Sequence, residues 1–175
     1  RDLFALSSDY DTTDKATQMF FAETQNKLLY AVTQKTAAEI IVSRADANSP
    51  NMALTNWKGT KVRKQDIYIA KNYLTKDEID TLNRLVVIFL ETAELRIKER
   101  IDISMEFWTK NVDRLLEFNN KPLLASKGSI SNKEMEDKVS EMYHLFEDRR
   151  KKQEAIADDK MELNELNELE KKLKR

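Results

Sequence analysis

The sequence predicts an all-α protein, an irregular multi-helix bundle with a long charged C-terminal helix. The first observation behind this fold class is the scarcity of turn residues, because a chain of 175 residues holds only two Gly and two Pro. The second is that 35% of the residues are charged and 41% are hydrophobic, which supplies both solvated helix faces and a core. The third is that apolar residues recur at spacings of three and four, as on amphipathic helices.

Composition also limits the class of protein. The absence of Cys excludes disulfides, thiolate zinc sites and Cys nucleophiles, and it fits a reducing compartment. The apolar run at 86–90 is far shorter than the roughly 20 residues that cross a bilayer, so we expect no membrane partner. A formal net charge of −1 argues against a surface that attracts polyanions everywhere. Basic residues instead cluster at 58–64, 149–152 and 171–175.

We predict three parts in the chain: a helical core domain at 1–120, a linker at 121–130, and a long C-terminal helix or helical tail at 131–175. The linker is predicted from its Pro, Gly and Ser content. Residues 1–7 are expected to end a helix that begins upstream. Because the chain starts with Arg1 rather than Met, we expect it to be part of a longer protein.

Two helices are predicted in the first part of the core domain. One begins at Thr13 or Asp14 and continues to about Thr33, since its apolar residues follow a helical period and no Gly or Pro intervenes. The next begins at Thr36, where Glu39 completes a capping box, so that hydroxyl and carboxylate each satisfy an unpaired backbone N–H.

Four further helices are predicted, and two of them also begin at capping boxes. A short helix is expected at 65–73, followed by a longer one at 75–97 that is apolar almost all round. We therefore expect the helix at 75–97 to be the central buried helix. The apolar pattern repeats at 104–118, and the last helix is predicted to start at Ser131 and to run toward Leu173.

The end of the last helix carries a narrow apolar seam, which follows the charged run 149–152. The seam consists of Leu163, Leu166, Leu169 and Leu173. The last three fit an a/d/a register of a coiled coil, whereas Leu163 does not. Burying the seam requires a partner helix, from this chain or from a second copy, and we expect a homodimer.

The loop predicted at 47–64 holds one Pro, one Gly and several Asn, and long ordered loops tend to be functional. It sets the indole of Trp57 beside four basic residues, a combination that can stack a base and neutralise phosphates. The plainer alternative, which we favour, is that Trp57 pins the loop to the core while the lysines are ordinary surface. The candidate binding residues are Arg44, Asp46, Asn51, Asn56, Trp57, Lys58, Lys61, Arg63, Lys64, Lys71 and Asn72.

Several segments of the chain carry a resemblance to a known family. They are RDLFALSSDYD at the start, ATQMFFAETQNKLLYAVT after it, and TAAEIIVSRADANSPNMALTNWKG, VRKQDIYIAKNYL and LNRLVVIFL between Thr36 and Leu90. With these segments the chain resembles the RhuM family of bacterial virulence-associated proteins, from Arg1 to about Asn119 and more loosely beyond. The resemblance implies a bacterial cytoplasmic protein and a helix-turn-helix-like DNA-binding region upstream, so that this chain is the C-terminal domain. It implies no particular reaction.

No catalytic constellation stands out in the sequence. His144 is the only His, so a His cluster or a Ser-His-Asp arrangement is excluded away from it. Glu39 and Asp46 are seven residues apart on one helix, whereas magnesium sites usually draw carboxylates from separate elements. The HxFx[DE]GNGR signature of Fic-type AMP transferases and glycine-rich phosphate loops are both absent. We expect no metal and no cofactor.

Three hypotheses for the function stay open. The favoured one is a helical interaction and oligomerisation domain that serves an upstream DNA-binding module. The first alternative is a nucleic-acid-binding domain that uses the Trp57 loop and its basic cluster. The second is an unrecognised enzyme or toxin-like effector, with a polar pocket near Arg44 and Asp46. The sequence favours a protein that is not an enzyme.

Overall fold

The computed structural model describes residues 7–9, 11 and 15–173. This part of the chain contains five α-helices, three short 3-10 turns and no strand, so the all-α prediction is confirmed. The α-helices are α1 (Lys15–Thr33), α2 (Ala37–Arg44), α3 (Lys76–Lys98), α4 (Met105–Phe118) and α5 (Asn132–Leu173). The turns are η2 (Pro50–Ala53), η3 (Asp66–Tyr68) and η4 (Ala70–Tyr73). None of the helices described is long and apolar enough to cross a membrane.

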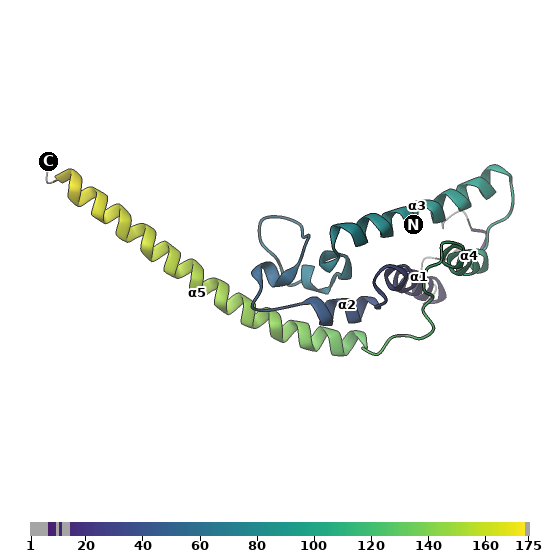
Figure 1. The fold of residues 1–175 in the computed structure, drawn as a ribbon, viewed down its shortest axis with the longest axis horizontal. Helices are drawn as coiled ribbons and strands as arrows, with labels where there is room; N and C mark the ends of the chain where they lie inside the picture. The colour runs from purple at the N-terminus through teal and green to yellow at the C-terminus, as the bar shows by residue number, and fades with distance from the viewer. Residues whose placement is uncertain (1–6, 10, 12–14, 174–175) are drawn as a thin grey trace.

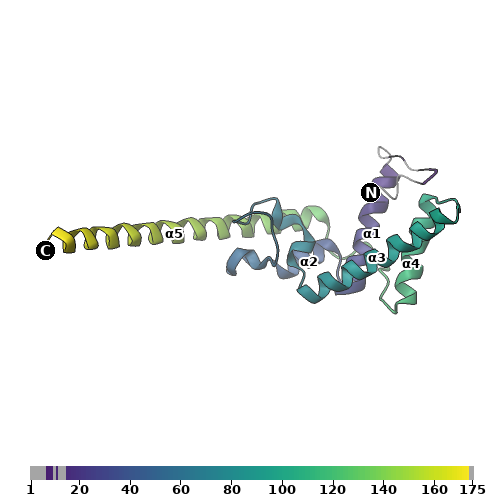
Figure 2. The same ribbon diagram turned by 90° about the horizontal axis from the view of Figure 1, so that it is seen from above.

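The helices form a packed body from which half of α5 projects. Helices α1, α3 and α4 pack on one another at one end of the body, while α2 connects α1 to the first part of α5 (Figure 1). The turns η3 and η4 contact α5 and α2, respectively. Figure 2 shows that the C-terminal half of α5 extends straight away from all other elements. At 1.5 Å per residue, the 42 residues of α5 span about 63 Å.

The core collects apolar side chains from every helix and from the turns. Its largest fully buried members are Leu29, Ile40, Ile41, Met52, Val62, Ile67, Leu74, Trp108, Val112, Leu116 and Val139. The indole N–H of Trp108 donates to the hydroxyl of Ser7 over 2.8 Å, which satisfies the polar atom of this buried side chain. Its ring lies 5.1 Å from the ring of Phe89, centroid to centroid, and so joins α4 to α3. The first part of α5 closes the core with Val139 and Phe146.

The predicted capping residues begin their helices. The backbone N–H of Thr36 donates to Glu39 over 2.8 Å, and that of Thr75 donates to Glu78 over the same distance. At the start of α5, the hydroxyl of Ser131 accepts from the backbone N–H of Glu134 over 3.2 Å. The predicted cap at Thr13 or Asp14 and the predicted helix end at 1–7, apart from Ser7, lie outside the described residues.

Two predictions about elements were wrong. Residues 65–73 do not form one helix, because Ile69 is extended with φ −103° and ψ 105° and separates η3 from η4. Side chains fix this kink: the amide of Asn72 donates to the carbonyl of Asp66, and the hydroxyl of Tyr73 donates to that of Ile67. Helix α3 is not buried all round, since it buries one stripe and leaves Val87, Ile88 and Leu95 exposed.

Candidate functional site

The loop at 47–64 lies against the middle of α5, and we call this region, residues 47–64 and 146–154, the loop–helix junction. Lys61 forms an ion pair with Glu154 at 2.7 Å. One guanidinium N–H of Arg150 donates to the carbonyl of Val62 over 3.4 Å. The junction therefore joins two basic clusters that lie about ninety residues apart in the sequence.

Asp46 shapes the beginning of the loop. Its carboxylate accepts from the hydroxyl of Ser49 over 2.7 Å and from the backbone N–H of Asn48 over 2.8 Å. These two hydrogen bonds, together with the nearby charge of Arg149, lower the pKa of Asp46 below its ordinary value. Asp46 is thus a turn-forming residue whose negative charge is held by its own loop.

The turn η2 holds three consecutive residues in the left-handed region, although none of them is Gly. The φ angles are 53° at Asn51, 56° at Met52 and 60° at Ala53. Each L-residue in this conformation costs about 1–2 kcal/mol relative to a right-handed turn. The side chain of Met52 is completely buried and anchors the turn. Strain of this kind persists where the surrounding structure imposes it, and it is concentrated at binding and catalytic sites.

A cavity of about 340 Å³ lies where this turn meets α5. It is lined by Asn48, Pro50 and Asn51 from the loop and by Phe146, Arg149, Arg150 and Gln153 from the helix. Arg149 donates to the side-chain oxygen of Asn48 over 3.3 Å and to the carbonyl of Ser49 over 3.4 Å. These hydrogen bonds are long for a charged donor and leave most of the guanidinium N–H groups without a bond in the described structure.

Trp57 and its basic neighbours cover the outer side of the loop. Trp57 is half-buried against the core, and its indole N–H is buried without a hydrogen-bond partner among the described residues. Lys58, Arg63 and Lys64 are exposed, whereas Lys61 is engaged by Glu154. The loop therefore offers cations to solvent beside an aromatic side chain that also packs on the core.

The remaining candidate residues lie apart from the cavity. Arg44 binds Glu78 through two hydrogen bonds of 2.6 Å and also donates to the carbonyl of Tyr73, which ties α2 to α3. The hydrogen bonds to Arg44 are the main cause that lowers the pKa of Glu78 to about 2. Asn72 is buried, and its carbonyl accepts from Thr55. Arg44 and Asn72 are thus engaged in contacts that hold the body together.

Of the candidate residues, only Asn51 lines the junction cavity. Asn56 and Lys71 are exposed and line neither this cavity nor the larger one described below. Sequence reasoning missed Asn48 and Gln153, and it grouped Arg149 and Arg150 with a solvated charged run. The missing information was the long-range contact between loop and helix, which a charge pattern does not encode.

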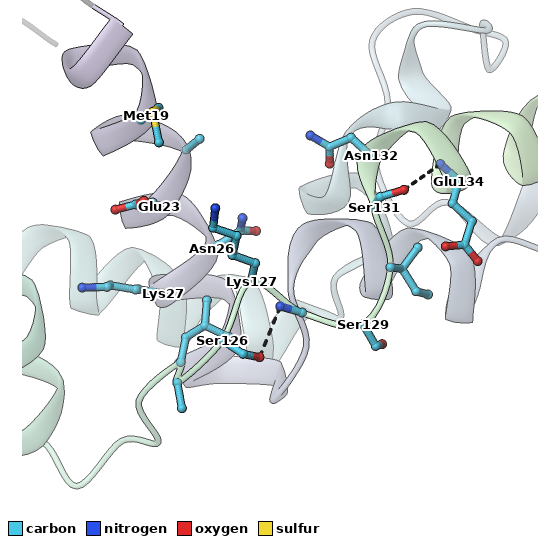
Figure 3. A pocket seen from close by; sticks show the side chains of 15 residues that line it. Met19, Glu23, Asn26, Lys27, Ser126, Lys127, Ser129, Ser131, Asn132 and Glu134 are labelled. Carbon is cyan, nitrogen blue, oxygen red and sulfur yellow. Dashed lines mark hydrogen bonds between the residues drawn. The ribbon is translucent and has the colours of Figure 1, made fainter.

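A second cavity, of about 760 Å³, opens between α1 and the segment at 124–132 (Figure 3). Several of its polar side chains already have structural partners. Asn26 accepts from the backbone N–H of Ala37 over 2.9 Å, and Lys27 pairs with Asp113 at 2.8 Å. Within the described part of the chain, no group of three His, Asp or Glu side chains is arranged to hold a metal ion.

Comparison with known proteins identifies the chain. The virulence protein RhuM family matches residues 1–154, which include the body, the loop–helix junction and α5 up to Glu154. Neither a curated protein nor a solved structure matches the chain. The match extends over most of the 175 residues and agrees with the segments that carry the resemblance. The chain belongs to the virulence protein RhuM family.

Proposed function

We propose that this virulence-family chain is a helical interaction and oligomerisation domain, which pairs with a second copy through the projecting half of α5 and serves an upstream DNA-binding module. One observation carries the proposal: every residue of α5 from 151 to 167 is exposed, whereas Met135, Val139, Tyr143 and Phe146 are buried against the body. The helix thus continues far beyond the body that stabilises its first half.

The projecting half carries apolar side chains that have no cover in the single chain. Ile156, Leu163 and Leu166 are 55%, 60% and 56% exposed, and Met161 is exposed as well. Tertiary packing supplies most of the stability of protein helices, and the side chains described at 155–167 are all exposed in the single chain. Burial of these side chains against a second helix therefore favours association. The side chains of Leu169 and Leu173 lie outside the described residues.

Charge on the projecting half does not set the direction of the pair. Basic residues lie at both of its ends, Lys151 and Lys152 at one and the cluster at 171–175 at the other, with carboxylates such as Asp158, Glu162 and Glu165 between them. A parallel pair and an antiparallel pair both bring basic ends together, so the proposal rests on the uncovered apolar side chains.

The test is the mass of the purified chain in solution, measured by light scattering after size exclusion. We expect twice the 20.5 kDa of one chain, and a single-chain mass for the double variant Leu163→Ser with Leu166→Ser. The matched control changes two polar residues of the same stretch, Lys160→Ser with Glu165→Ser, and is expected to keep the double mass. A native chain that is monomeric at high micromolar concentration would sink the proposal.

A second candidate function, nucleic-acid binding, is favoured by the contact between the basic loop and the basic run of α5. Two clusters in one place give a wider cationic surface than either alone. Labelled single- and double-stranded DNA and RNA are to be titrated over a salt series. Binding that weakens with salt and is lost in Trp57→Ala and in a Lys61/Arg63/Lys64→Ala triple would support this function.

A further inference from the structure

We propose that the cavity at the loop–helix junction is a binding site for a phosphate group, held by Arg149 and Arg150 together with the amides of Asn51 and Gln153. This site is independent of the pairing of α5. It extends the second candidate function, because it names the chemical group that is bound and the side chains that bind it.

The first argument is the unused hydrogen-bonding capacity of two adjacent guanidinium groups. Each guanidinium carries five N–H donors. The bonds described for Arg149 are both 3.3 Å or longer, and they go to neutral acceptors on Asn48 and Ser49. Arg150 donates to Val62 and to Glu147 over 3.4 and 3.2 Å, while its Nε is buried without a hydrogen-bond partner. A phosphate oxygen is a stronger acceptor than the neutral oxygens of Asn48, Ser49 and Val62, whereas Glu147 already gives Arg150 one charged partner.

The second argument is that nearby carboxylates are already engaged. Asp46 is held by Asn48 and Ser49, as described above, and Glu154 is paired with Lys61 at 2.7 Å. Glu147 pairs with Arg150 over 3.2 Å, and Glu154 also lies 3.9 Å from the Nε of Arg150, so both carboxylates face the guanidinium of Arg150. Nothing described pairs with the charge of Arg149 at salt-bridge distance, so the cavity has positive charge available for an anion.

The third argument is the shape of the site. The cavity of about 340 Å³ is larger than a phosphate ion requires and leaves room for the sugar or base that carries it. Of the three left-handed residues, Asn51 lines the cavity, and the buried side chain of the next residue, Met52, fixes the turn. One strained residue thus lies in the wall of the cavity, as strained residues of binding sites do.

Guanidinium groups bind phosphate, like carboxylate, through paired N–H···O bonds and a permanent charge. The phosphate can belong to a mononucleotide or to a nucleic-acid backbone, and both share this chemistry. Lys58, Arg63 and Lys64 on the same loop are exposed, and a polynucleotide needs such additional cations for its further phosphates. The probes are therefore inorganic phosphate, deoxythymidine 5′-monophosphate and a twelve-residue oligodeoxythymidine.

The experiment titrates the full chain with each probe at low salt and follows binding by calorimetry and by NMR. The pocket variant is Arg149→Gln with Arg150→Gln, and the matched control is Lys151→Gln with Lys152→Gln, which removes the same charge from the exposed neighbours in the same helix. We expect the pocket variant to lose affinity at least about tenfold and the affinity of the control to stay within about twofold of the native value.

Because the pocket variant also loses contacts to the loop, Gln153→Glu serves as a second variant. Gln153 is exposed, and the new carboxylate repels phosphate without removing a described contact.

If the mononucleotide binds saturably, and if Gln153→Glu abolishes this binding, the cavity is a site for phosphate monoesters. Binding of the oligonucleotide alone, with the same response to the variants, would assign the site to a nucleic-acid backbone. Equal losses in the pocket variant and the lysine control would overturn the proposal, because the effect would then come from general charge. Absence of binding of all three probes would overturn it as well.

Discussion

At the residue scale, Glu39 joins two segments that are ninety positions apart. One oxygen of its carboxylate accepts from the backbone N–H and the hydroxyl of Ser129 over 2.7 Å, and the other accepts from the backbone N–H of Thr36. The hydrogen bonds from Ser129 and Thr36 lower the pKa of Glu39 from 4.5 to about 2. One carboxylate thus caps α2 and fastens the segment before α5 to it.

These hydrogen bonds predict a loss of stability in acid. The pKa of Glu39 and that of Glu78 are both lowered to about 2 in the folded chain, so each contributes stability that is present above its ordinary value of 4.5. This contribution is lost as the pH falls from about 4.5 toward 2. Urea unfolding at a series of pH values measures it. Glu39→Gln is expected to flatten the pH dependence in this window, and an unchanged slope would contradict the role of Glu39.

Two glycines give a matched pair of variants. Both have positive φ, +87° at Gly128 and +93° at Gly59. A Cβ on Gly128 would lie 2.7 Å from the Cγ2 of Thr36 and 2.8 Å from its Oγ1, whereas a Cβ on Gly59 would meet only the end of the Arg63 side chain at 3.4 Å. Gly128→Ala is therefore expected to lower the free energy of unfolding by about 2–4 kcal/mol, and Gly59→Ala by about 1 kcal/mol. Equal losses in urea unfolding would show that the segment before α5 does not pack closely on Thr36.

At the element scale, rules about residues close in sequence predicted more of the structure than rules about packing between helices did. Capping residues and apolar periods located the starts of α2, α3 and α5, because a cap is a contact between residues three apart. Residues 65–73 departed from prediction because the side chain of Asn72 bonds to the backbone of Asp66 and bends the segment. The exposure of Val87 and Leu95 was not predictable either, since periodicity shows which faces are apolar but not which of them is covered.

The turn η2 predicts a stabilising substitution. Ala53 has a φ of 60°, where Gly has no steric penalty, so Ala53→Gly removes strain from the folded chain. The relief exceeds the entropy that Gly adds to the unfolded chain, and the free energy of unfolding is expected to rise by about 0.5–1 kcal/mol. Ala22→Gly, on the exposed side of α1, is the control and is expected to cost about 1 kcal/mol. Losses of equal size at both positions would show that the turn is not strained at Ala53.

At the scale of the whole molecule, the candidate site depends on a contact that the sequence does not reveal. The basic residues of the loop and those of α5 were visible separately as clusters. Their meeting follows from the docking of α2 and η3 on the first half of α5, which aligns the loop with the helix. Two neutral residues of the cavity, Asn48 and Gln153, belong to no sequence pattern that predicts a binding site. Sequence reasoning thus found the loop and the charge but not the cavity between them.

The family match covers only the first part of α5. The match ends at residue 154, close to the point where α5 leaves the body, so the body and the junction fall within it and the projecting helix lies beyond it. No side chain described at 155–167 is buried, so these residues add little to the stability of the body. The fold and the phosphate site are therefore expected to be separable from self-association.

A chain shortened to residues 1–154 tests this separation. It retains the ion pair of Lys61 with Glu154 and every residue of α5 that is buried in the described part of the helix, so its midpoint of urea unfolding at low concentration is expected to match that of the full chain. Its mass is expected to be that of one chain, because the projecting apolar side chains are gone. Its affinity for deoxythymidine monophosphate is expected to be unchanged, since Arg149, Arg150 and Gln153 remain.

A shortened chain that unfolds would show that the projecting half supports the body. One that still forms a dimer would move the self-association surface to the body, where the exposed face of α3 with Val87, Ile88 and Leu95 is the next surface to alter.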